Sequence, residues 1–207
     1  AKYEQAQRLD RFIRCCQSVA AEGASRLADS IEPDAEPGKV VLPDHQADQL
    51  TEIVDNVLHA TKVLDFWKFG EQLPYGRGVT ALFHGPSGTG KTMAAISVAR
   101  RLNVRVLRVD LSRLVSKYIG DTEKNIDRVF KDAQRSGAAI LLDEAEAILG
   151  RRSEVRDAHD RYANIEVAYL LQRMETHTGL AILTTNLRQN IDPAFLRRLR
   201  FVIEFPF

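Results

Sequence analysis

The chain has 207 residues, of which 44% are hydrophobic and 28% charged, and its 29 basic and 28 acidic residues leave a formal net charge of +1. This length and composition indicate one folded domain, or one domain with an extension, and argue against a disordered chain. The balanced charge gives no support for a nucleic-acid or membrane partner through bulk electrostatics. No apolar run approaches the ~20 residues of a membrane-spanning helix, so we expect a cytoplasmic protein.

The first part of the chain is predicted to be helical. Residues 1–31 have apolar side chains at helical spacing, the proline-containing segment IEPDAEPGK follows as a linker, and we assign residues 1–43 to a helical segment with its linker. A second amphipathic helix begins near Asp44 and opens the main domain, residues 44–207. Three aromatic residues after this helix, Phe66, Trp67 and Phe69, are expected to pack in a core, and a wall of the adenine pocket is the alternative interpretation.

From residue 79 onward, short apolar runs alternate with helical patterns. The runs have the length and composition of strands, and they are VTALFH (79–84), VRVLRV (104–109), AAILLD (138–143), LAILTT (180–185) and FVIEF (201–205). Helices are expected to begin near Gly90, Asp121, Arg161 and Asp192. This alternation predicts an α/β fold: a doubly wound, five-stranded parallel sheet with helices on both faces.

A glycine-rich segment joins the first of these strands to the next helix. GPSGTGKT (85–92) matches the phosphate-loop pattern G-x-x-x-x-G-K-[ST] in the required strand–helix context. Backbone N–H groups and the helix N-terminus would surround phosphates, Lys91 would reach the β and γ phosphates, and Thr92 would hold Mg²⁺. The predicted nucleotide-binding residues of this phosphate-loop NTPase are Gly85, Pro86, Ser87, Gly88, Thr89, Gly90, Lys91 and Thr92.

Two acids end the third strand. Asp143 would lie at the carboxyl edge of a parallel sheet, where such folds bind ligands, and it suits the Mg²⁺ shell. Glu144 is placed to act as the general base for an attacking water. The alternative interpretation is an acidic helix start, since Asp143, Glu144 and Glu146 would all favour a helix N-terminus.

Four segments together resemble the AAA ATPases over residues 44–207. They are GPSGTGKT (85–92), SKYIGDTEKNI (116–126), LLDEAEA (141–147) and LTTNLRQNIDPAFLRRLRF (183–201). The resemblance implies that residues 44–207 are the large subdomain of an ATPase that uses ATP and Mg²⁺ and forms a homohexameric ring when complete. It also implies that Lys117, Tyr118 and Ile119 line the central pore and contact a protein substrate, with a buried Tyr118 as the alternative.

The resemblance also predicts roles for residues in the last of these segments, 183–201. Asn186 stands where the family has an asparagine that positions the hydrolytic water, and an Asx turn is the alternative. Arg197 and Arg200 keep the spacing of two arginine fingers that reach the neighbouring subunit's nucleotide. Arg198 has the alternative interpretation of a solvated helix end. The pair Arg198-Leu199 departs from the family's usual Pro-Gly.

The resemblance therefore predicts ATP hydrolysis that remodels, unfolds or disassembles a protein substrate through a pore. A nucleic-acid-directed protein of the helicase-loader type and a nucleotide-gated scaffold with little turnover are the alternatives. The FLRRLRF segment (195–201) also resembles a bacterial branch associated with contractile injection machines. The chain ends at EFPF, where the family continues into a helical lid, and we expect a fragment without that lid, with a reduced variant of the family as the alternative.

Overall fold

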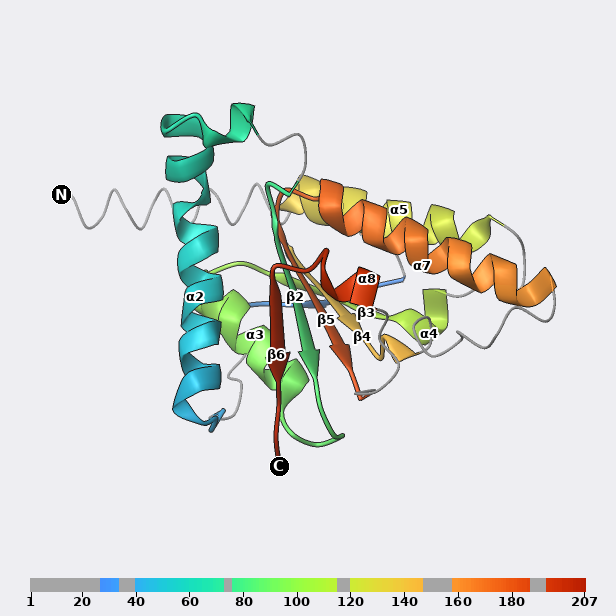
Figure 1. The fold of residues 1–207 in the computed structure, drawn as a ribbon, viewed down its shortest axis with the longest axis horizontal. Helices are drawn as coiled ribbons and strands as arrows, with labels where there is room; N and C mark the ends of the chain where they lie inside the picture. Colours follow the sequence, from blue (N-terminus) through green and yellow to red (C-terminus); the bar gives the residue numbers. More distant parts are fainter. Residues whose placement is uncertain (1–26, 34–39, 73–75, 115–119, 147–157, 187–192) are drawn as a thin grey trace.

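A six-stranded sheet forms the centre of the computed structural model, with its strands in the order β1-β3-β4-β5-β2-β6 (Figure 1). The structure describes residues 27–33, 40–72, 76–114, 120–146, 158–186 and 193–207, and its account of side chains omits residues 158–164 and 193–194. Strands β3, β4, β5, β2 and β6 are parallel to one another, and β1 pairs antiparallel with β3.

The elements follow the predicted alternation closely. The strands are β1 (Asp29–Ile31), β2 (Val79–His84), β3 (Val106–Asp110), β4 (Ala139–Asp143), β5 (Leu180–Thr185) and β6 (Phe201–Glu204). The helical elements are α2 (Asp44–Thr61), η1 (Lys62–Phe66), η2 (Phe69–Glu71), α3 (Lys91–Arg101), α4 (Leu111–Leu114), α5 (Asp121–Ser136), α7 (Ala158–Thr176) and α8 (Pro193–Leu196). The α/β fold with helices on both faces is confirmed.

Apolar layers cover both faces of the sheet. On one face, α2 and α3 pack against alternate residues of the strands, and the small side chains Ala94, Ala95 and Ala99 let α3 approach the sheet closely. On the other face, α4, α5, α7 and α8 pack against the intervening strand residues. Strands β2, β4 and β5 are buried along almost their whole length, as expected for parallel strands covered on both sides.

The sequence prediction was wrong about the strand count and about the end of the first helix. Residues 29–31 form β1 and not helix, so the sheet has six strands and is mixed, where five parallel strands were expected. Three residues carry too little periodicity to predict a strand, and β1 is defined by its pairing with the edge of β3. Arg105 adds an ion pair to Glu32 at 2.8 Å. The helix expected over residues 1–26 lies outside the described residues.

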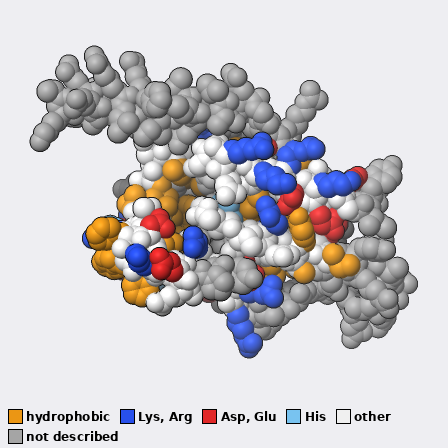
Figure 2. Space-filling model, turned by 90° about the horizontal axis from the view of Figure 1, so that it is seen from above, with side chains coloured by type: hydrophobic (Ala, Val, Ile, Leu, Met, Phe, Trp, Pro, Cys, Tyr) orange, Lys and Arg blue, Asp and Glu red, His pale blue; other side chains and the backbone are white. Residues whose placement is uncertain are grey.

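The aromatic residues after α2 are exposed, contrary to their expected core role. Phe66, Trp67 and Phe69 are 81%, 55% and 52% exposed. Figure 2 shows hydrophobic side chains at the left of the face seen from above, where η1 and η2 lie in Figure 1. Within the described part of the chain, no helix has the length and apolar character needed to span a membrane.

Candidate functional site

The glycine-rich segment forms a tight loop between β2 and α3. Gly85 has φ +143°, and a Cβ there would lie 2.2 Å from the carbonyl oxygen of Phe205, so only glycine fits at this contact. Gly88 and Gly90 also have positive φ, +82° and +89°, and the space beside each of them is open. The loop thus combines left-handed backbone with unfilled space next to it, which suits the close approach of a ligand to the main chain.

Lys91, the first residue of α3, folds back over this loop. Its Nζ donates to the carbonyl oxygens of Gly85 at 2.8 Å and Pro86 at 2.6 Å, and to Oδ1 of Asn186 at 2.9 Å. Burial lowers the pKa of Lys91, and the negative charges of Glu146 and Asp143 partly oppose that effect. A buried cation is therefore held at the mouth of the loop.

The hydrogen-bond acceptors of Lys91 test whether the site fits a phosphate. Lys91 is only 7% exposed, and its three acceptors are neutral oxygens. Burying a charge is costly unless an opposite charge compensates it. Among the residues that the structure describes, no carboxylate forms an ion pair with Nζ. An anion bound in the loop would supply the missing direct ion pair, so the donor set fits a phosphate group.

Asp143, at the end of β4, accepts hydrogen bonds from three elements. Arg108 of β3 donates to Oδ2 from Nε at 2.9 Å and from NH2 at 2.7 Å, and Thr184 of β5 donates to Oδ1. The Thr92 hydroxyl, on α3, lies 3.3 Å and 3.4 Å from the two carboxylate oxygens. The two residues expected to hold Mg²⁺, Thr92 and Asp143, therefore face each other, and an oxygen-only donor set suits this cation.

Glu144 follows Asp143 with a left-handed backbone. Its φ is +57°, an uncommon conformation for a residue with a side chain, and such conformations cluster at functional sites. The side chain is exposed, and no hydrogen bond or ion pair joins its carboxylate to another described residue. The next residue, Ala145, is anchored because its N–H donates to the carbonyl oxygen of Thr184 at 2.9 Å. Glu144 thus presents an exposed carboxylate, held by no described residue, directly after Asp143 in the chain.

Asn186 links the end of β5 to both the loop and the acidic segment. Besides accepting from Lys91, it donates from Nδ2 to Oε1 of Glu146 at 2.6 Å, and its main-chain N–H lies 3.4 Å from Oε2 of the same carboxylate. Glu146 therefore fixes the orientation of the Asn186 amide. Asn186 lies among the other predicted site residues because β5 runs between β4 and β2.

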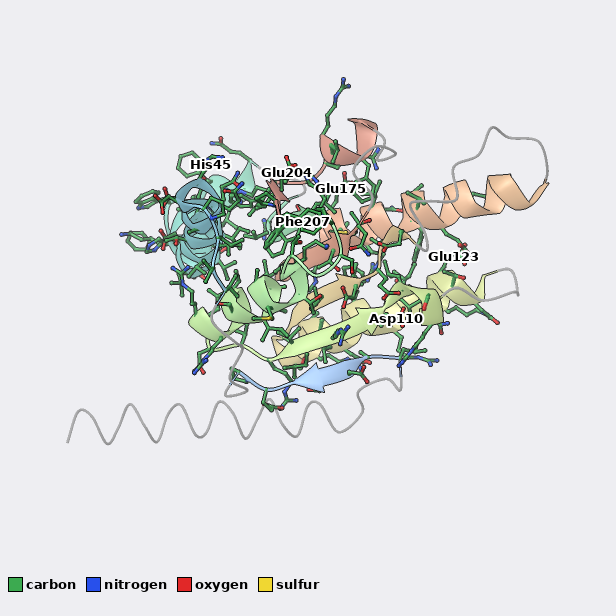
Figure 3. The ribbon with its side chains drawn as sticks, turned by 90° about the horizontal axis from the view of Figure 1, so that it is seen from below. His45, Asp110, Glu123, Glu175, Glu204 and Phe207 are labelled. Carbon is green, nitrogen blue, oxygen red and sulfur yellow. The ribbon has the colours of Figure 1, made fainter. Side chains whose placement is uncertain are left out.

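The arginines that follow α8 divide into two kinds. Arg198 pairs with Glu175 of α7 at 3.5 Å, and Figure 3 labels Glu175. Arg197 and Arg200 have exposed side chains, and neither forms an ion pair with a described residue. Main-chain contacts from Arg200 N to the carbonyl oxygen and hydroxyl of Thr80, at 3.1 Å and 3.2 Å, anchor this segment to β2. Within the described part of the chain, no carboxylate therefore holds the guanidinium of Arg197 or Arg200.

Three residues of this site were missed or assigned elsewhere by sequence reasoning. Arg108 and Thr184 hold Asp143, and Glu146, interpreted as part of an acidic helix start, holds Asn186. Arg108 and Thr184 could have been noticed as polar side chains within otherwise apolar strands. That pattern does not indicate which residues they contact. The predicted pore residues 117–119 lie outside the described residues.

Comparison with known proteins identifies the family. The sequence model of the ATPase family associated with various cellular activities (AAA) matches residues 81–207, more than half of the chain. The chain belongs to the AAA family. Its fold is therefore that of a phosphate-loop NTPase.

Individual relatives of this AAA domain carry proteasome names. It is 32% identical to a 26S proteasome regulatory subunit 6B homolog of Aspergillus niger, over 90% of this chain and 44% of that protein. It is 34% identical to the proteasome-activating nucleotidase of Methanococcus vannielii, over 82% of this chain and 42% of that protein. The chain thus spans less than half the length of these relatives. The expected link to the contractile-injection branch is not supported, since these relatives belong to the proteasome group.

Proposed function

We propose that this AAA domain binds and hydrolyses ATP with Mg²⁺ at the loop between β2 and α3. The observation that carries the proposal is the buried Lys91 cation, whose hydrogen bonds go to neutral oxygens only. A triphosphate offers a direct anionic partner, whereas the Glu146 and Asp143 carboxylates act on Lys91 without contacting its Nζ. The Thr92–Asp143 pair beside it offers oxygen ligands for a divalent cation.

Five residues of the site have chemical roles in this proposal. Lys91 neutralises charge on the β and γ phosphates, and Thr92 and Asp143 hold Mg²⁺, which supplies further neutralisation of the phosphate oxygens when bound. Glu144 accepts a proton from the attacking water, for which its exposed and uncommitted carboxylate is suited. Asn186 releases Lys91 to the phosphate and holds that water with its amide.

The work done with ATP is proposed to be the remodelling of proteins in a ring. Support comes from the family and from relatives named as proteasome regulatory subunits and proteasome-activating nucleotidases. In a homohexamer, Arg197 and Arg200 of one subunit would stabilise the transition state at the next subunit's nucleotide, and their exposed side chains are compatible with that role. Residues 117–119 would line the pore and contact the protein substrate, in the cytoplasm.

Two variants test the nucleotide site. Lys91→Ala should weaken ATP binding by more than about tenfold, because it removes charge-assisted hydrogen bonds worth ~1.5–3 kcal/mol each. Glu144→Gln should keep ATP affinity and lower turnover by roughly 100-fold or more, because an amide is not a general base. Lys124→Ala is the matched control, since Lys124 is an exposed lysine that pairs with Asp121 of its own helix at 3.4 Å.

Calorimetric titration and phosphate release measure these effects. Unchanged ATP affinity in a folded Lys91→Ala chain would show that the loop is not the nucleotide site. Turnover of Glu144→Gln at the wild-type rate would exclude the general-base role. Salt-dependent binding of an oligonucleotide would favour the nucleic-acid-directed alternative, and tight ATP binding with negligible turnover in assembled wild-type rings would favour the scaffold.

A further inference from the structure

The carboxylate of Asp143 is held from both of its neighbouring strands. Because β4 lies between β3 and β5 in the sheet, Arg108 and Thr184 approach Asp143 from opposite sides. Arg108 donates twice to Oδ2, at 2.9 Å and 2.7 Å, and Thr184 donates to Oδ1. Each strand thus fixes one oxygen, and the carboxylate cannot rotate without breaking one of these contacts.

The edge of the Asp143 carboxylate that faces Thr92 makes the weakest hydrogen bonds. The Thr92 hydroxyl lies at nearly equal distances, 3.3 Å and 3.4 Å, from the two oxygens. Both distances are long for an O–H···O hydrogen bond, which is usually ~2.7–2.8 Å. The arrangement therefore leaves room for stronger interactions between this edge, the hydroxyl and a cation or its waters.

Arg108 stands out on its strand. The other four residues of β3 are buried or partly buried, whereas Arg108 is exposed, and its side chain keeps 45% exposure while that of Asp143 keeps 9%. Arg108 lies on the α3 face of the sheet, since β3 alternates and Val106 belongs to the core layer beneath α3. A fork-shaped guanidinium gives the Asp143 carboxylate both charge compensation and a fixed orientation.

We propose that Arg108 is a positioning residue of the nucleotide site: it orients the Asp143 carboxylate so that its free edge faces Thr92 and receives Mg²⁺ together with the nucleotide. The inference rests on the proposed Mg²⁺-ATP site and adds a residue from β3 to it. Arg108 acts through Asp143, so its loss changes the Mg²⁺-dependent part of nucleotide binding and spares the part that depends on the loop and Lys91.

The test separates these two parts of binding. Affinity for the fluorescent analogue mant-ATPγS is measured by titration with excess EDTA and across a series of MgCl₂ concentrations. In EDTA, the affinity of Arg108→Gln for mant-ATPγS should stay within about twofold of wild type. The MgCl₂ concentration that gives half of the Mg²⁺-dependent increase in affinity should rise roughly tenfold. An effect of this size is usual when a group that orients a metal ligand is removed. Arg108→Lys, with a charge but no fork, should fall between the two.

A matched control and a second variant complete the experiment. Arg113→Gln removes an exposed arginine that pairs with Asp110 at 3.4 Å, and Figure 3 labels Asp110 at the end of β3. This control should behave as wild type. If Arg108→Gln does not fold, as judged by circular dichroism, Thr184→Val removes the donor on the opposite strand, β5, at nearly constant shape and should raise the MgCl₂ requirement in the same direction.

The outcomes distinguish the inference from the proposed function. A wild-type Mg²⁺ requirement in folded Arg108→Gln overturns the positioning role. A lower requirement also overturns it, because the guanidinium would then compete with the cation for Asp143. If the wild-type chain shows no affinity for mant-ATPγS with or without MgCl₂, the proposed function itself is wrong, and the inference is rejected with it.

Discussion

Acidification should destabilise the domain through one buried histidine, His177. This residue follows α7, is 6% exposed, and packs edge-on against Phe130 with 5.4 Å between ring centroids. Gly179 also lies close to the ring, because a Cβ at Gly179 would be 2.7 Å from Nε2 of His177. Burial, with a smaller contribution from the positive charge of Arg173, lowers the pKa of His177 from 6.5 to about 4.

The direction and size of the effect follow from this pKa. Between pH 6.5 and about 4, the unfolded chain binds a proton at His177 that the folded chain does not, so unfolding becomes easier as the pH falls through this window. Through this lowered pKa, acidification reduces the unfolding free energy by at most about 3 kcal/mol. About 2 kcal/mol of that reduction occurs between pH 7 and pH 5. Asp110 and Asp127, whose pKa values lie below 3.8, lose their contributions to the unfolding free energy only at lower pH.

Urea unfolding followed by circular dichroism at pH 7 and pH 5 measures this loss. His177→Gln does not titrate, so its unfolding free energy should lack the loss of about 2 kcal/mol that His177 causes in wild type. Any cost of repacking appears at both pH values and cancels in the comparison. His45→Gln is the control, since His45 is exposed in the first turn of α2 (Figure 3). Equal pH dependence in His177→Gln and wild type would refute the assignment.

Three further substitutions test the site. Gly85→Ala places a Cβ 2.2 Å from a main-chain carbonyl oxygen at φ +143°, so the unfolding free energy should fall by roughly 1–3 kcal/mol and ATP affinity should fall with it; unchanged urea midpoint and affinity would contradict the loop geometry. Glu146→Ala frees the Asn186 amide and should lower turnover about tenfold with little change in ATP affinity, measured by calorimetry. Arg197→Ala should lower turnover of assembled rings by roughly 100-fold or more, whereas Arg198→Ala should not; equal effects would remove the distinction between them.

Local patterns predicted most of the elements. The apolar run at 138–143 is buried on both faces as β4, and the residues Ile126, Val129, Phe130 and Ala133, at helical spacing, form the buried side of α5. In both cases the burial of a residue can be predicted from the apolar pattern of nearby residues, within two turns of a helix or within one strand. The exposed aromatics after α2 show the limit, because the sequence marks Phe66 as apolar but does not say whether another element covers it.

The sequence by itself determined the alternation of strands and helices. It also determined that a glycine-rich loop, an acidic pair and an asparagine each follow a strand, in that order along the chain. Both are visible in the sequence because strand length, helix periodicity and glycine-rich turns depend on residues that are adjacent in the chain. The tertiary structure alone decided that β1 joins the sheet beside β3, and that Arg108, Thr184 and Glu146 support the site. The side-chain contacts of Arg108, Thr184 and Glu146 join residues 35 to 41 positions apart. Strand order brings such residues together, and the order of the strands depends on how the whole chain buries its apolar surface.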